Sequence, residues 1–147
     1  MHRVEREVEI DAAPDAVFPY LVDGALRRRW MGVLRETEEL TDGPPAVGSR
    51  WRDVFEDLGR RIELEAELAV YEPPRRLLVK LTSRGIEATS EQRLQPTGGR
   101  TRLTAVIETD YRTAAARVAG VILTHRAQRQ LEADLAALKG LVEEETG

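Results

Sequence analysis

The 147-residue sequence contains no cysteine and only two histidines, His2 and His125. Without cysteine the chain has neither disulfides nor thiol chemistry, so a cytoplasmic location is the default expectation. Two isolated histidines without a nearby carboxylate cluster also argue against a metal site. We therefore expect neither a metal nor a cofactor.

The sequence also lacks long apolar runs and an excess of basic charge. No run approaches the ~20 apolar residues of a membrane-spanning helix, and the N-terminus, MHRVEREVEI, has no apolar secretion segment. The net charge is −4, with 22 mostly arginine basic residues interleaved among 26 acidic ones. This balance argues against nucleic acid as a partner. The 41% of hydrophobic residues fit one globular domain over residues 1–147, and the Arg, Ala and Glu bias is typical of a GC-rich bacterial genome.

The C-terminal run 113–145 predicts a helix of roughly 50 Å, at ~1.5 Å per residue. Its inward apolar stripe is predicted to contain Ala127, Leu131, Leu135, Leu138 and Val142. The first half of the same face carries Gly120, Thr124, Gln128 and Arg117. Polar residues on an inward face are either satisfied buried groups or the roof of a cavity. Gly120 is the place where we expect the helix to bend or restart.

Alternation of apolar and polar residues predicts seven strands, of which six are consecutive. The first five strands are expected at residues 3–10, 33–40 (at an edge), 49–56, 61–70 and around Leu77, Val79 and Leu81, and the last two at 86–95 and 101–111. Between the first two strands, Pro14 and Asp23 are placed to begin two short helices. This order predicts an α+β fold, in which a seven-stranded curved antiparallel sheet surrounds a long C-terminal helix.

Small residues on the inward faces of this sheet oppose small residues on the helix. Either the sheet flattens onto the helix or a cavity remains, because native packing density needs bulkier neighbours. We expect a cavity of several hundred Å³, on the order of a small-molecule site. Its predicted walls are Trp51, Phe55, Leu64, Ala66, Leu68, Ala88, Ser90, Gln92, Ala105 and Tyr111, with Asp53 among them and a roof of Gly120, Thr124 and Gln128.

Four segments of the chain resemble the SRPBCC superfamily, also called START-like or Bet v 1-like, and within it the bacterial polyketide cyclase/dehydrase-like group. They are VEIDAAPDAVFPYLVD, LRRRWMG, RLQPTGGRTRLT and ADLAALKGLVE. The resemblance implies the helix-grip fold and a cavity between sheet and helix for a hydrophobic or aromatic small molecule. Members of the superfamily include polyketide cyclases and carriers of lipids or quinones.

Few side chains offer catalytic chemistry. Asp53, flanked by Trp51 and Phe55, is expected to be paired, raised in pKa, or in contact with a ligand, and Arg117 is a candidate partner for the pairing. His125 is either an exposed helix residue or an acid or base at the cavity rim. The catalytic set is thus unknown from the sequence.

Two functions follow from the predicted cavity together with what the resemblance implies. The first is a binding or carrier protein for a small apolar ligand, and the alternative is a polyketide cyclase or dehydratase with Asp53, Gln92 or Tyr111 near an enolisable carbon. Protein contact through the outer sheet face is a third possibility. The expected partner is therefore a small apolar molecule, with no nucleic acid and no integral membrane segment, and the chain is expected to act as a monomer or homodimer.

Overall fold

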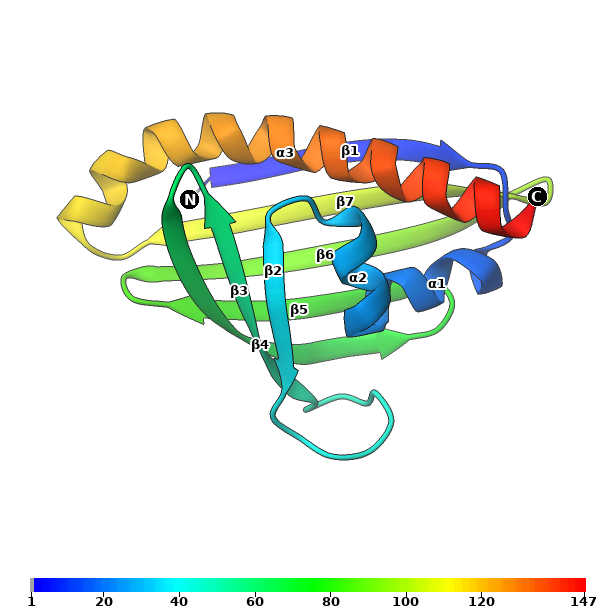
Figure 1. The fold of residues 1–147 in the computed structure, drawn as a ribbon, viewed down its shortest axis with the longest axis horizontal. Coiled ribbons are helices and arrows are strands. Elements are labelled where there is room, and N and C mark those ends of the chain that lie inside the picture. The colour runs from blue at the N-terminus through cyan, green and yellow to red at the C-terminus, as the bar shows by residue number, and fades with distance from the viewer. Residues whose placement is uncertain (1) are drawn as a thin grey trace.

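In a computed structural model, which describes residues 2–147 apart from the side chains of residues 118–124, seven antiparallel strands curve beside one long helix (Figure 1). The elements are β1 (His2–Ile10), α1 (Pro14–Val22), α2 (Gly24–Trp30), β2 (Leu34–Glu39), β3 (Arg50–Asp57), β4 (Arg60–Glu72), β5 (Arg76–Ser83), β6 (Ile86–Thr97), β7 (Arg100–Tyr111) and α3 (Ala114–Thr146). This arrangement confirms the predicted α+β helix-grip fold.

The sheet runs in the order β1-β7-β6-β5-β4-β3-β2, so the predicted edge position of β2 is confirmed. Most of its connections are tight turns between consecutive strands. The turn from β6 to β7 uses Gly98 and Gly99, whose φ angles of 63° and 86° suit glycine because it has no Cβ. Glu63, Glu65 and Glu67 on β4 are exposed, as expected for the outer face.

One predicted strand face is wrong at its end. The alternation of residues 61–70 predicts Val70 on the same inner face as Ala66 and Leu68, but the β4–β5 register shifts between Leu68 and Val70. Beyond this bulge Tyr71 pairs with the buried Leu77 and packs against the core, with its ring 5.8 Å from that of Phe18. A bulge inserts one extra residue and so exchanges the two faces of the strand beyond it.

The two short helices form a corner at one end of the sheet. Asp23 ends α1 and caps α2, accepting a hydrogen bond from the backbone N–H of Leu26 at 3.0 Å. Trp30 is buried in the core, and its indole N–H donates to the carbonyl of Tyr20 at 2.8 Å. The corner is therefore fixed by a helix cap and by a hydrogen bond between its two helices.

Helix α3 is held to the sheet by the second half of its predicted apolar stripe. Leu131, Leu135, Leu138 and Val142 are all buried, and the helix packs mainly against β1. Ala127 is exposed, which corrects the prediction that the stripe begins there. In this turn the neighbouring Arg126 is half-buried instead, because its side chain reaches across to β3. The predicted roof positions Gly120 and Thr124, and the expected bend at Gly120, lie outside the described side chains.

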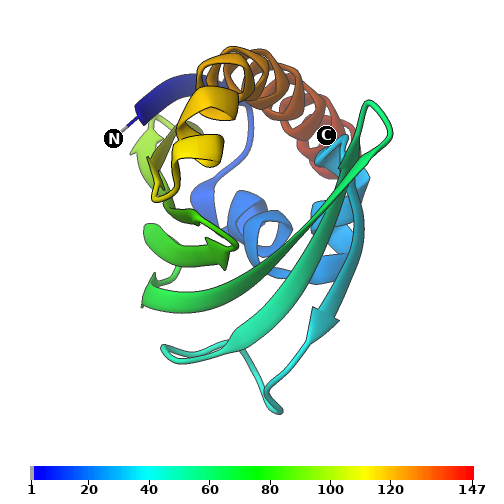
Figure 2. The same ribbon diagram turned by 90° about the vertical axis from the view of Figure 1, so that its left-hand side faces the viewer.

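A second side of α3 is polar and contacts the end of β3 and the segment between α2 and β2. Arg126 forms two-pronged hydrogen bonds with Asp57 at the end of β3, at 2.6 to 3.0 Å. Asp134 accepts from the backbone N–H of Gly32 at 2.9 Å and from the side-chain amide of Gln130 at 2.7 Å. The helix thereby bridges β1 and the β3–β4 hairpin, which lie on opposite sides of it in Figure 2.

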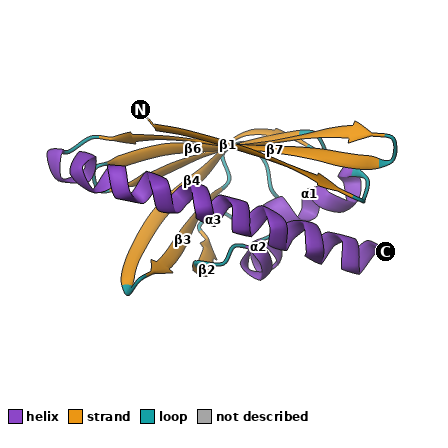
Figure 3. Cartoon of the chain, turned by 90° about the horizontal axis from the view of Figure 1, so that it is seen from above, coloured by secondary structure: helices purple, strands orange, loops and turns teal. Residues whose placement is uncertain are grey.

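Near its C-terminal end α3 passes beside α1 and α2 (Figure 3). Glu145 accepts hydrogen bonds from Arg29 at 2.9 and 3.1 Å and from the hydroxyl of Tyr20. The bonds from Arg29 and Tyr20 lower the pKa of Glu145. Within the described part of the chain, no helix is both long and apolar enough to cross a membrane.

Candidate functional site

A cavity of about 390 Å³ lies between the α1–α2 corner and the inner face of the sheet. Its apolar lining includes Leu21, Trp30, Met31, Phe55, Leu68, Leu77, Val79 and Leu81. Its polar lining includes Asp23, Arg27, Thr37, Glu39, Thr41, Ser49, Arg50, Asp53, Ser90 and Gln92, together with the amphipathic Trp51. The strands supply these inward side chains at every second position, while α2 and the β2–β3 loop supply the opposite wall.

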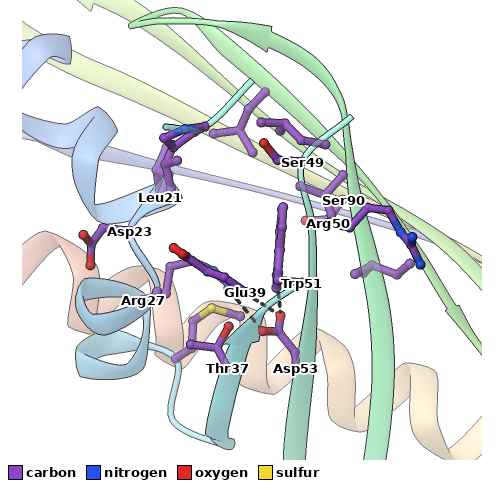
Figure 4. Close-up of a pocket in the computed structure, with 18 of the residues that line it drawn as sticks. Leu21, Asp23, Arg27, Thr37, Glu39, Ser49, Arg50, Trp51, Asp53 and Ser90 are labelled. Atoms are coloured by element: carbon purple, nitrogen blue, oxygen red, sulfur yellow. Dashed lines mark hydrogen bonds and ion pairs between the residues drawn. The ribbon is translucent and has the colours of Figure 1, made fainter. Parts of the chain in front are cut away.

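The central polar group of the cavity is a buried ion pair between Arg27 on α2 and Asp53 on β3. Arg27 Nη1 and Nη2 donate to the two carboxylate oxygens of Asp53 at 3.2 and 2.6 Å (Figure 4). Their side chains are only 10% and 1% exposed. This two-pronged geometry is the strong form of a charge-assisted hydrogen bond. It joins the helical wall of the cavity to its strand wall.

The expectation that Asp53 is paired is confirmed, but its partner is Arg27 and not Arg117. The Arg117 guanidinium instead donates to the carbonyl of Tyr111 at 3.2 Å, at the junction of β7 and α3. Asp53 therefore contacts α2, whereas Asp57 at the end of the same strand contacts α3 through Arg126.

Trp51 completes the cluster around the ion pair. Its indole N–H donates to Asp53 at 3.2 Å, and the Arg27 guanidinium carbon lies 5.6 Å from the centre of the Trp51 ring. A guanidinium at this distance is attracted by the aromatic face. Asp53 thus accepts from both Arg27 and Trp51, which leaves it poorly placed to act as a free base.

A second polar pair lies on β6. The side-chain amide of Gln92 donates to the hydroxyl of Ser90 at 3.3 Å, and both residues line the cavity. Near the α1–α2 corner and β2, the cavity lining carries the acidic Asp23 and Glu39, whereas Arg50 is paired with Glu65. The cavity therefore combines leucine, valine and aromatic side chains with polar and charged groups, and its surface is more apolar than polar. Apolar walls with convergent polar groups are typical of small-molecule sites.

The structure places the predicted wall residues in two groups. Those that line the cavity are Trp51, Asp53, Phe55, Leu68, Ser90 and Gln92. Those outside its lining are Leu64, Ala66, Ala88, Ala105, Tyr111 and Gln128. Ala66 and Ala105 are buried in the packed core, and Tyr111 forms an edge-to-face contact with His2 at 5.2 Å. The cavity lies nearer to the small helices than expected, and no described residue of α3 lines it.

The remaining candidate groups stand apart from the cavity. His125 is exposed on α3, which corresponds to the simpler of its two expected placements. Asp134 is buried, and this burial raises its pKa despite hydrogen bonds from Gly32 and Gln130. In the described part of the chain, no group of three or more His, Asp or Glu side chains is arranged to hold a metal.

Arg27 is the main site residue that the sequence analysis missed. It lies in a run of three arginines, Arg27 to Arg29, so composition alone gives no sign of which one faces inward. Its spacing of three residues from the buried Trp30 was the available signal, because residues i and i+3 share a helix face. The cavity residues of α1 and the β2–β3 loop were missed because no alternation marks them.

The chain matches the profile of the family described as "Polyketide cyclase / dehydrase and lipid transport" over residues 1–143. No curated protein sequence gives a significant match. Among solved structures, the chain is similar to the Zhui aromatase/cyclase of Streptomyces sp. R1128, with a TM-score of 0.84 and 21% identity over 99% of this chain and 96% of that one.

Two further structures extend the comparison. A protein from Thermus thermophilus aligns with a TM-score of 0.82 and 15% identity, over 99% of this chain and 100% of that chain. A norcoclaurine synthase point mutant from Thalictrum flavum, solved with a transition-state analogue, aligns with a TM-score of 0.74 and 16% identity, over 99% and 96%. At these identities the likeness concerns the fold.

Proposed function

Because the chain belongs to the polyketide cyclase / dehydrase and lipid transport family, within the SRPBCC superfamily, we propose that it is a binding or carrier protein for a small hydrophobic or aromatic molecule. The ligand, which is lipid, polyketide or quinone-like, occupies the cavity between the α1–α2 corner and the sheet. We further propose that the protein acts in the cytoplasm as a monomer or homodimer.

The observation that carries this proposal is the composition of the cavity. Its space of about 390 Å³ falls within the range of small-molecule pockets, and leucine, valine and aromatic side chains form much of its wall. Burial of apolar ligand surface contributes roughly 25 cal/mol per Å², before the cost of ordering the ligand. An apolar molecule with one or two polar ends is therefore favoured over a sugar or nucleotide.

The state of the polar groups favours binding over catalysis. Asp53, the carboxylate deepest in the site, is occupied by Arg27 and Trp51. None of the described residues that line the cavity is a histidine. A general base needs a free lone pair within reach of the substrate proton, and these contacts leave Asp53 without that freedom.

Cyclisation or dehydration of a polyketide-like chain is the second candidate. The Ser90–Gln92 pair favours it, because a hydroxyl and an amide in an apolar wall can orient a carbonyl beside an enolisable carbon. Such a role requires turnover as well as binding. The two candidates therefore differ in whether a linear polyketone is released unchanged or cyclised.

Native mass spectrometry of the purified protein, followed by titration with the uncharged dye N-phenyl-1-naphthylamine, tests the proposal. We expect either a co-purified small molecule or saturable dye binding at one site per chain. A chain that is empty as purified and binds no dye would contradict the proposed function. Conversion of a linear polyketone into a cyclic product would favour the enzymatic candidate instead.

A further inference from the structure

The net charge of the Arg27–Asp53 pair determines which polar group of a ligand can be buried next to the pair. Both residues line the cavity, and their side chains are 10% and 1% exposed. Asp53 accepts from Arg27 at 2.6 and 3.2 Å and from Trp51 at 3.2 Å. The cluster is therefore electrically neutral as a unit, and the hydrogen-bonding capacity of its carboxylate is largely satisfied by the protein.

Arg27 retains hydrogen-bond donors that Asp53 does not use. A guanidinium has five N–H groups, and among the described contacts Arg27 directs one from each terminal nitrogen to Asp53. Its position over the Trp51 ring, 5.6 Å from the ring centre, holds the guanidinium against the cavity wall. A ligand oxygen in the cavity can thus accept a charge-assisted hydrogen bond from Arg27.

An anionic ligand is both attracted and repelled by the Arg27–Asp53 pair, unlike a neutral one. Its attraction to Arg27 is offset by repulsion from Asp53, whose carboxylate oxygen lies 2.6 Å from the guanidinium nitrogen. Removing a carboxylate from water is costly unless an unpaired positive charge compensates for it. Asp23 and Glu39 also line the cavity, but both residues are exposed, so solvent screens their charges and Asp53 supplies the main repulsion. A neutral acceptor requires no compensating charge.

We propose that the cavity selects uncharged apolar molecules that carry a hydrogen-bond acceptor, such as a ketone or quinone carbonyl. Arg27 donates to the acceptor, and Asp53 excludes carboxylates by neutralising Arg27. This inference rests on the proposed function, because it names the chemical class of ligand for the same cavity.

The affinities of three matched probes test the inference independently of the proposed function. Each affinity is measured at neutral pH from the displacement of bound N-phenyl-1-naphthylamine. The probes are the hydrocarbon 2-ethylnaphthalene, the ketone 2-acetylnaphthalene and the anion 2-naphthoate, which share a ring system and differ at one substituent. We expect the ketone to bind about tenfold or more tightly than the anion, and more tightly than the hydrocarbon. Equal affinity for ketone and hydrocarbon, or preference for the anion, would overturn the inference while leaving the proposed function intact. Failure of the dye to bind to protein that native mass spectrometry shows to be empty as purified would overturn both.

The variant Asp53→Asn provides the sharpest test, because it leaves Arg27 without its counter-charge. We expect the preference to reverse, with 2-naphthoate gaining about tenfold or more in affinity relative to 2-acetylnaphthalene. The control is Glu87→Gln, which removes a carboxylate paired with Arg112 at 2.6 Å on the exposed part of the sheet. An unchanged order of probes in folded Asp53→Asn would overturn the proposed role of Asp53.

The double variant Arg27→Met/Asp53→Leu keeps the test decisive if Asp53→Asn does not fold. Apolar side chains replace both charges, so no buried charge is left unpaired. We expect 2-ethylnaphthalene to bind as it does to the wild type, or more tightly, and the advantage of the ketone over the hydrocarbon to disappear. Retention of the ketone advantage in the double variant would overturn the assignment of Arg27 as the donor to the acceptor.

Discussion

At the scale of single residues, the Arg27–Asp53 pair links the cavity to the stability of the fold. Removal of one partner leaves the other as an uncompensated buried charge, since the Asp53 side chain is 1% exposed. We predict that Arg27→Met alone destabilises the protein by about 3–5 kcal/mol. The double variant Arg27→Met/Asp53→Leu should recover most of that loss.

Urea unfolding of both variants and the wild type measures this coupling. A double variant that is less stable than Arg27→Met would contradict it, because the pair would then contribute through its own attraction rather than through avoidance of an unpaired charge.

The pH dependence of stability should reveal the buried Asp134. Burial raises its folded-state pKa above the ordinary value of 3.8, so its ionised form costs stability at neutral pH. This cost is fully present above the folded pKa and disappears as pH falls below the unfolded value. Asp134→Asn retains an oxygen that can accept from Gly32 and Gln130 but never ionises.

We therefore predict that Asp134→Asn gains stability relative to the wild type near neutral pH, and that this gain shrinks as pH falls toward 3.8 and is lost below it. Urea unfolding across that range provides the measurement. Asp134→Ala, which removes the acceptor altogether, should lose about 1–3 kcal/mol and serves as the control. A gain in Asp134→Asn that is the same at every pH would contradict the raised pKa of Asp134.

At the scale of elements, α3 has an anchoring half whose apolar residues are buried. Leu135 is 4% exposed, whereas Gln128 is half-buried outside the cavity lining. We predict that Leu135→Ala costs about 2–5 kcal/mol, as buried leucine truncations do. Gln128→Ala should cost much less. Thermal unfolding compares the stabilities of the two variants. Equal losses of stability would show that the packed half of α3 extends further toward the start of the helix.

The elements that the sequence predicted best are those with strong periodicity. The strands alternate clearly, and the stripe from Leu131 to Val142 repeats at helical spacing. The sequence did not reveal the bulge after Leu68, because Val70 and Tyr71 both suit a strand interior and only the pairing with β5 selects between them. Ala127 was misplaced because alanine fits either an inward or an exposed helix face.

The candidate site was less predictable than the fold, because it combines residues from strands, helices and a loop, which do not share one repeating pattern of apolar residues. The strand residues Trp51, Asp53 and Phe55 were identified from their alternation. The opposite wall comes from α1, α2 and an irregular loop, whose positions depend on how the chain turns at the corner. The partner of Asp53 was mistaken for that reason, since contacts between distant segments leave no periodic trace in the sequence.

At the scale of the whole molecule, the curved sheet and α3 form a frame, and the α1–α2 corner bounds the cavity on one side. Ser90 lies on the inner face of β6 and lines the cavity, whereas Thr89 lies on the outer face of the same strand. A phenylalanine at position 90 would occupy cavity space, and one at position 89 would add a similar ring outside it. This pair of neighbouring positions isolates the effect of filling the cavity.

The dissociation constant of N-phenyl-1-naphthylamine for Ser90→Phe and Thr89→Phe, measured by fluorescence titration, tests the central claim most directly. If the cavity is the ligand site, Ser90→Phe should weaken dye binding by at least about tenfold, while Thr89→Phe should bind as the wild type does. Circular dichroism confirms that both variants are folded. Equal dye affinity in folded Ser90→Phe and the wild type would contradict the assignment of the ligand site to this cavity.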